Sequence, residues 1–191
     1  PTFFPLPLGI GSENAAHRFA VEWDDQGQRR EGVFIARRDS SSRLNALLGG
    51  RLVPGVHHHA RFTVVENGGR LSVAFKSDDG AIAACVKGRV AEQLPTGSAF
   101  ASLEEASRFF ESGSLGYSVT KEPGRLDGLQ LSCRTWHVQP LEVESGESTY
   151  FADVRRFPAG SATFDCALLM RNVEHEWHSR EDLCCGEPAM R

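Results

Sequence analysis

Lysine is scarce in this 191-residue chain, which contains only Lys76, Lys87 and Lys121. Long hydrophobic runs are also missing, and nothing approaches the ~20 apolar residues that a membrane-spanning helix needs. The apolar segment Thr2–Ile10 is short, contains Pro and Gly, and has no basic region before it, so it does not match a signal peptide. We therefore expect no membrane partner.

An excess of positive charge is missing as well. The formal net charge is -4, which argues against nucleic acid as a partner because phosphate tracks are bound by basic patches. The arginine pairs at 29–30, 37–38 and 155–156 are interrupted by acidic or apolar residues. We interpret these pairs as solvated strand ends.

Motifs of common enzyme classes are absent too. The chain has no Gly-x-Ser-x-Gly elbow, phosphate-binding loop or dinucleotide fingerprint. The five cysteines are an odd number, and Cys85, Cys133 and Cys166 lie inside apolar runs. They suggest buried thiols in a reducing compartment, so a cytoplasmic location is expected. Cys184-Cys185 is expected in an exposed polar tail.

Short alternating segments separated by turns dominate what the chain does contain. The turn sequence Asn67-Gly68-Gly69 is a strong hairpin signal. The apolar run 166–170 predicts a central strand buried on both faces. In all, strands are expected at 17–24, 31–37, 59–66, 70–77, 81–91, 115–121, 129–136, 137–144 and 161–172.

Two short helices interrupt the strand pattern. The first follows the serine-rich segment 39–42, carries leucines at helical spacing over 44–48, and can end at Gly49-Gly50. The second begins after Ser102, which has capping-box spacing to Glu105. Its predicted buried stripe consists of Leu103, Ala106, Phe109 and Phe110.

These elements predict a mainly β (α+β) protein of one domain over residues 1–191. The core should cover about 17–178, with flexible ends. Many short strands with two helices imply an antiparallel curved sheet that closes into a barrel or half-barrel. Such closure removes exposed sheet edges and can leave room for a small ligand.

Several motifs occur in a characteristic order between residues 30 and 172. They are Gly32-Val33-Phe34-Ile35, the helix 43–48, Val56-His57-His58-His59-Ala60-Arg61, Ser102-Leu103-Glu104-Glu105, Gly116-Tyr117, and Trp136-His137-Val138-Gln139-Pro140-Leu141. In this order the chain resembles the YqjF-like family of bacterial proteins of unknown function, within the acetoacetate decarboxylase-like superfamily. The resemblance implies an acetoacetate decarboxylase-like barrel. Relatives usually carry a longer N-terminal region with additional strands.

The resemblance also indicates which chemistry is lost. In acetoacetate decarboxylases a Gly-aromatic-Pro-Lys-Lys element supplies a lysine that forms a Schiff base with the substrate. The corresponding positions here are His58 and His59. Because imidazole has no primary amine, decarboxylation by that route is not expected.

The triple histidine is the leading site candidate. If Phe62 faces the core, strand alternation puts His58 on the same side, and His59 and Arg61 on the other. Arg61 and Arg134 could bind a carboxylate bidentately, and a satisfied core imidazole is the competing interpretation for each histidine. The predicted ligand pocket consists of His58, His59, Arg61, Tyr117, Arg134, Trp136 and His137, with His58 and His59 as catalytic candidates.

No metal and no cofactor are predicted. His57 and His59 could present two imidazoles to one side, but no acidic residue follows at the interval that cupin-like sites use. The segment His175-Glu176-Trp177-His178 lacks the i+4 histidine of a zinc-protease helix.

The sequence thus favours a small-molecule-binding protein for an organic or oxo acid that lacks the Schiff-base lysine. One alternative is an enzyme that uses His58 or His59 as a general base in enolisation or hydrolysis. Another is a structural or interaction module with a filled interior. A homo-oligomer is left open.

Overall fold

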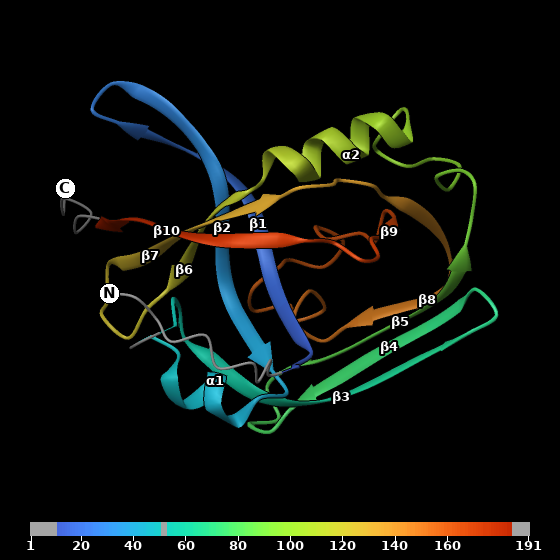
Figure 1. The fold of residues 1–191 in the computed structure, drawn as a ribbon, viewed down its shortest axis with the longest axis horizontal. Helices are drawn as coiled ribbons and strands as arrows, with labels where there is room; N and C mark the ends of the chain where they lie inside the picture. The colour runs from blue at the N-terminus through green and yellow to red at the C-terminus, as the bar shows by residue number, and fades with distance from the viewer. Residues whose placement is uncertain (1–10, 51–52, 185–191) are drawn as a thin grey trace.

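The computed structural model describes residues 11–50 and 53–184, which form one curved, mixed sheet and two short helices (Figure 1). The helices are α1 (Arg43–Leu48) and α2 (Leu103–Ser112). The strands are β1 (Asn14–Asp25), β2 (Gln28–Ser40), β3 (His57–Asn67), β4 (Arg70–Ser77), β5 (Ala83–Val90), β6 (Leu115–Val119), β7 (Arg125–Cys133), β8 (Gln139–Ser148), β9 (Ala167–Leu169) and β10 (His175–Cys184). The mainly β class is therefore confirmed.

The sheet departs from the predicted antiparallel barrel in two ways. Its order is β10-β7-β6-β2-β3-β4-β5-β8-β9, with β1 paired to β2. Two pairs are parallel, β2 with β3 and β2 with β6, so the sheet is mixed. Within the described residues no hydrogen-bonded ladder joins the ends of this order. Parallel pairing arises because long connections, rather than hairpins, lead from β2 to β3 and to β6.

Strand β2 holds the two halves of the sheet together. Along one edge it pairs with the whole of β1, and along the other it pairs with β6 at 33–35 and with β3 at 38–40. Strand β3 then leaves β2, and from Ala60 onward it pairs with β4. The three histidines therefore lie where the chain passes from one half of the sheet to the other.

One face of the sheet carries an aromatic core. Phe62 of β3 stacks on Phe75 of β4, with ring centroids 5.1 Å apart. His17 of β1 lies 4.1 Å from the ring of Tyr150, which is 4 % exposed. Tyr150 belongs to the segment after β8, whose Phe157 also packs against Phe19. Burying these rings is the main apolar contribution on this side of β1 and β2.

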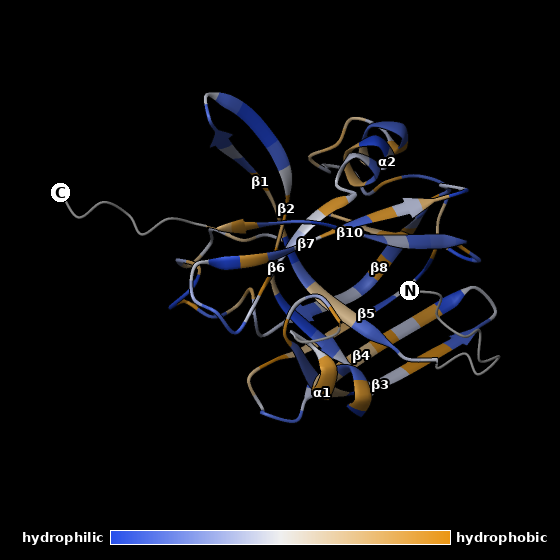
Figure 2. Ribbon diagram, turned by 60° about the vertical axis from the view of Figure 1, so that its left-hand side comes forward, coloured by the Kyte–Doolittle hydropathy of each residue, from blue (hydrophilic) through white to orange (hydrophobic). Residues whose placement is uncertain are grey.

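Several local predictions hold. Ser42 and Ser102 cap α1 and α2 by accepting hydrogen bonds from the amides of Asn45 and Glu105. The hairpin of β3 and β4 has its turn at Gly68-Gly69, both with positive φ. Apolar and polar residues alternate along these two strands (Figure 2).

Other predictions are wrong. The segment predicted as a doubly buried central strand yields only β9, whose three residues occupy one end of the sheet order. Within the predicted buried stripe of α2, Phe109 and Phe110 are 48 % and 47 % exposed. The expected polar C-terminal tail pairs with β7 as β10, as far as Cys184, although Cys184 is exposed as predicted. Strand pairing, which is not local, overrode the local pattern at β9 and β10. The exposed phenylalanines show that α2 is covered less completely than its apolar stripe predicts.

The segment Thr2–Ile10 and Cys185 lie outside the described residues. Among the residues that the structure describes, no helix is long and apolar enough to cross a membrane.

Candidate functional site

Two arginines on neighbouring strands share one face of the sheet, opposite the aromatic core. In the β1–β2 ladder Ala16 pairs with Arg38 and Arg18 pairs with Ile35. A register shift between His17 and Arg18 leaves one extra residue in β2. Such a bulge changes the face to which the following side chains point. It thereby puts Arg38 on the same face as Arg18.

Arg18 and Arg38 line one cavity of about 390 Å³. Its other walls come from β1, β2, α1, the segment before β3, and the strands β7 and β10. The remaining lining residues are Asn14, Ala15, Ala16, Asp39, Asn45, Val53, Pro54, His57, Leu129, His175 and Trp177. A largely apolar hollow with a few polar groups is typical of small-molecule sites.

Neither arginine has a carboxylate partner among the described residues. Arg38 donates from Nε to Oγ of Ser118 over 3.0 Å, while one of its terminal nitrogens is buried without a hydrogen-bond partner. Burial, followed by repulsion from Arg18, lowers the pKa of Arg38 to about 10. Arg18 is solvent-accessible, yet partial desolvation by the surrounding protein lowers its pKa as well. Both remain cationic at neutral pH, so the cavity holds uncompensated positive charge.

Arg37, the residue before Arg38, shows how carboxylates in this protein compensate the charge of a buried guanidinium. Arg37 points to the opposite face, where it binds Asp39 at 2.8 Å and Asp79 at 2.9 Å. Asp39 is fully buried and Arg37 is 12 % exposed. The prediction that the pair at 37–38 is a solvated strand end is therefore wrong. One arginine completes a structural ion pair, and the other lines a cavity.

The first histidine of the triplet belongs to the cavity. His57 pairs with Arg38 in the parallel ladder and so shares its face. Its Nδ1 lies 3.0 Å from the carbonyl oxygen of Gly55. Burial lowers the pKa of His57, so the ring is neutral at pH 7. It offers a hydrogen-bonding group without adding charge.

The two predicted catalytic histidines lie elsewhere. His58 Nδ1 is 3.3 Å from Asp79, and His59 Nδ1 is 2.7 Å from Asp78. Arg61 also contacts Asp78, at 3.3 Å. Neither histidine lines the cavity that contains Arg18 and Arg38.

The other predicted pocket residues are not brought together. Arg134 is 72 % exposed and lies 3.6 Å from both Glu174 and Glu176. Trp136 donates from its indole nitrogen to Ser107 of α2. Tyr117 is buried and packs edge-on against Trp23. His137 is exposed.

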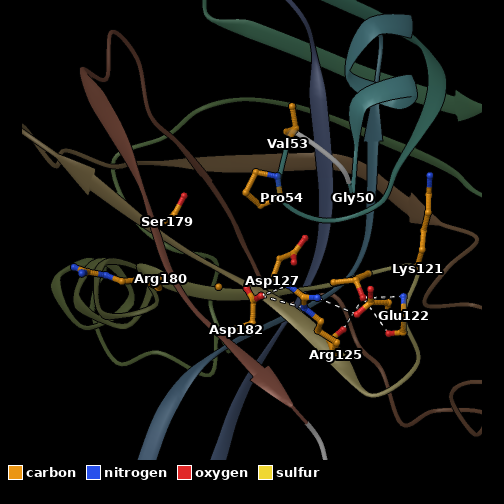
Figure 3. Close-up of a pocket in the computed structure, with 12 residues that line it drawn as sticks. Gly50, Val53, Pro54, Lys121, Glu122, Arg125, Asp127, Ser179, Arg180 and Asp182 are labelled. Atoms are coloured by element: carbon orange, nitrogen blue, oxygen red, sulfur yellow. Dashed lines mark hydrogen bonds and ion pairs between the residues drawn. The ribbon is translucent and has the colours of Figure 1, made fainter. Parts of the chain in front are cut away.

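A second cavity, of about 270 Å³, lies between the segment that follows α1, the β6–β7 turn and the strands β7 and β10, and it is shown in Figure 3. Its most prominent cation, Arg125, is already bound at 2.7 Å to Asp182 and at 2.9 Å to Glu122. The three cations of this cavity, Lys121, Arg125 and Arg180, are balanced in number by three carboxylates that also line it, Glu122, Asp127 and Asp182, whereas Arg18 and Arg38 have no carboxylate partner among the residues that the structure describes.

Within residues 11–50 and 53–184, no cluster of three or more His, Cys, Asp or Glu residues could hold a metal ion. Cys166 is not an activated nucleophile, because burial and the neighbouring Asp165 raise the pKa of its thiol to about 11.

A scan of the chain against models of known protein families gives no match. A search of curated proteins also finds no relative.

Sequence reasoning missed Arg18 because it interpreted that residue as part of the polar face of a half-buried strand. A usable signal was present. The predicted partner strand ends at residue 37, directly before Arg38, so two arginines occur in or beside adjoining strands. The bulge that brings them together is not visible in the sequence.

Proposed function

We propose that this protein binds a small organic acid, including oxo acids, in the cavity that contains Arg18 and Arg38. The observation that supports this is a pair of arginines in a hollow without a carboxylate partner. Removing a guanidinium group from water, as at Arg38, is costly unless it is paired. A bound carboxylate would supply the missing acceptors, and arginine is well suited to bidentate carboxylate recognition.

The apolar walls contributed by Leu129, Pro54 and Trp177 fit the carbon skeleton of such an acid. His57 could donate to, or accept from, an oxo or hydroxyl oxygen on the same ligand. The set of cavity groups therefore matches a carboxylate next to a second polar function.

We also propose that the curved sheet is a form of the acetoacetate decarboxylase-like barrel in which the lysine chemistry is lost. The support is the resemblance at 56–61, where His58 and His59 occupy the two lysine positions. Lys76 and Lys87 are exposed, and Lys121 lines the other cavity. Borohydride treatment in the presence of acetoacetate should leave the protein mass unchanged. A stable adduct on Lys87 or Lys121 would overturn this part of the proposal.

Binding is tested with pyruvate, acetoacetate and hexanoate as probes. We expect at least one probe to raise the melting temperature and to change tryptophan emission, because Trp177 lines the cavity. Arg38→Met should abolish both effects, whereas Arg70→Met removes the same charge from an exposed position and should keep them. If a probe no longer binds to Arg134→Met but still binds to Arg38→Met, the binding site is instead the predicted set of residues around Arg134.

An enzyme with a histidine base is the second candidate function. It is favoured by the 2.7 Å contact between His59 Nδ1 and Asp78, since a carboxylate that orients an imidazole is the usual arrangement of a general base. Because His59 lies outside the cavity of Arg18 and Arg38, this function requires the oxo acid to bind beside His59 instead, and hydrogen–deuterium exchange at its α-carbon would reveal enolisation. His59→Ala should then abolish the exchange while leaving probe binding intact; exchange that survives in this variant would exclude the histidine.

A further inference from the structure

The cavity of Arg18 and Arg38 does not end at Arg18. A narrow hollow of about 20 Å³ shares Arg18, Leu129 and Trp177 with it. That hollow in turn shares Arg18, Val33 and Gly113 with a third hollow of about 670 Å³. Linked by these shared residues, the three hollows lie in a row along the face of β1 and β2, from the start of β3 to the end of α2, and together are named the groove.

The two ends of this groove differ in chemistry. At the β3 end are Arg38, Arg18 and His57. At the α2 end the floor is formed by Ala20, Val21 and Val33, and the wall by Phe109 and Phe110. The groove is therefore cationic at one end and apolar at the other.

The groove explains why two phenylalanines of α2 are exposed. Phe109 and Phe110 pack edge-on against each other, with centroids 5.3 Å apart, yet about half of each residue is open to solvent. Their helical spacing is that of a buried stripe, but within the described residues no side chain covers them fully. An apolar ligand segment in the groove would cover the part that faces β1.

Acidic residues at the α2 end of the groove determine the orientation of a bound acid. Glu22 and Glu31 line the groove at the α2 end. Glu22 is paired with Arg29, so the repulsion of a carboxylate there comes mainly from Glu31. The acid group would then lie at Arg38 and Arg18, with the tail toward α2. From Ala16, opposite Arg38, to Ala20 the strand advances about 13 Å, a span that suits a tail of roughly eight to ten carbons.

We propose that the natural ligand is a monocarboxylate with an unbranched hydrocarbon tail, bound with its head between Arg18 and Arg38 and its tail along β1 toward Phe109 and Phe110. This inference rests on the proposed function, because it uses the same arginine pair, and it adds the class of acid. The constriction at Arg18 admits a methylene chain and excludes bulky or branched tails.

The test is a titration of acetate, hexanoate and decanoate below their aggregation concentrations, followed by calorimetry. We expect affinity to rise about three- to fourfold for each methylene that is fully buried. The ten-carbon dicarboxylate should bind at least tenfold more weakly than decanoate, because its second carboxylate would lie near Glu22 and Glu31. Decanol, which lacks the acid group, should not bind measurably.

Two variants separate this inference from the proposed function. Ala20→Trp fills the tail half of the groove and should abolish the preference for decanoate while leaving acetate or hexanoate binding unchanged. Ala162→Trp adds the same side chain at an exposed position outside the groove and should bind decanoate like the wild type. Arg38→Met should weaken every acid.

Each outcome has a definite meaning. If short acids bind and depend on Arg38, but longer tails add nothing, the hydrocarbon tail is wrong and the proposed function stands. If decanoate binds equally well to Arg38→Met, or decanol binds as well as decanoate, adsorption to apolar surface replaces the proposed mode. If no acid binds the wild type, both proposals fail.

Discussion

Arg38 and Ser118 are joined by a 3.0 Å hydrogen bond from Nε to Oγ, across strands that are 80 residues apart in the sequence. Ser118 is 1 % exposed, so its hydroxyl is held in place by the packing around it. This contact fixes the direction of the guanidinium, whose buried Nη2 has no hydrogen-bond partner among the described residues. It is the link through which the fold orients the proposed anion site.

Ser118→Ala should weaken carboxylate binding several-fold, because Arg38 loses the group that orients it. The free energy of unfolding should fall by about 1–2 kcal/mol, since a buried donor is left without its acceptor. Calorimetric titration and urea unfolding measure the two effects. Ser132→Ala, at an exposed position of β7, serves as the control and should change neither.

Arg37 and Arg38 should respond differently to the same substitution. Arg37→Met leaves the buried carboxylate of Asp39 without its partner and should cost about 3–5 kcal/mol. Arg38→Met removes a buried nitrogen that has no partner but also leaves the hydroxyl of Ser118 without its donor, so the two effects oppose each other and the melting temperature should change little, at the expense of binding. Thermal unfolding of both variants without ligand decides this. A large loss of stability in Arg38→Met would show that its charge is compensated.

Gly55→Ala should be strongly destabilising. A methyl group at this position would lie 2.6 Å from the Cβ of Ser118, and the backbone φ is +78°. The hairpin glycine Gly68 also has positive φ, but nothing lies within 4 Å of its added Cβ. Both variants share the backbone strain of about 1 kcal/mol, so the additional loss in Gly55→Ala measures the clash. If Gly55→Ala and Gly68→Ala lose the same free energy of unfolding in urea, the segment around Gly55 moves aside at no energetic cost.

Asp79 should contribute to acid sensitivity. Partial burial acts to raise its pKa, but hydrogen bonds from Ser77, the amide of Ala81 and Arg37 outweigh this and hold the pKa well below the usual value. With a depressed folded pKa, the stabilisation is complete above the unfolded value of about 4 and is lost as pH falls below it. Asp79→Asn should cost about 1–3 kcal/mol at pH 7 and progressively less toward pH 3. A pH-independent difference between variant and wild type would contradict the assignment.

His17 should make the protein less stable in mild acid. Burial lowers its pKa, and Arg37 and Arg156 add to this against the opposing charge of Asp39. Below about pH 6.5 the unfolded chain therefore binds a proton that the folded protein does not, so stability falls as pH falls through this window. His17→Phe keeps an aromatic ring beside Tyr150 and removes the buried Nδ1 that lacks a partner.

In urea unfolding, His17→Phe should therefore gain stability relative to the wild type at pH 5 and show little difference at pH 7.5. His57 retains a similar dependence in both proteins, because its pKa is lowered as well. If the two pH profiles are parallel, His17 does not titrate in this range.

The local sequence predicted the features that depend on a few neighbouring residues. Ser42 and Ser102 act as caps because a side-chain oxygen needs only the amide three residues on. The turn at Gly68-Gly69 forms because glycine readily adopts positive φ. The predictions failed for the short strand β9 and the exposed Phe109, because strand length and burial there depend on which distant part of the chain packs against them.

By itself, the sequence determined a mainly β chain with two short capped helices, because hydrophobic period and turn chemistry are local properties. It also limited the lysines to three, which bounds the Schiff-base chemistry available. The tertiary structure alone decided that the sheet is mixed and that Arg18 and Arg38 meet on one face. The physical reason is that the pairing of β2 with three strands, and the bulge at His17 and Arg18, follow from contacts between residues far apart in the chain.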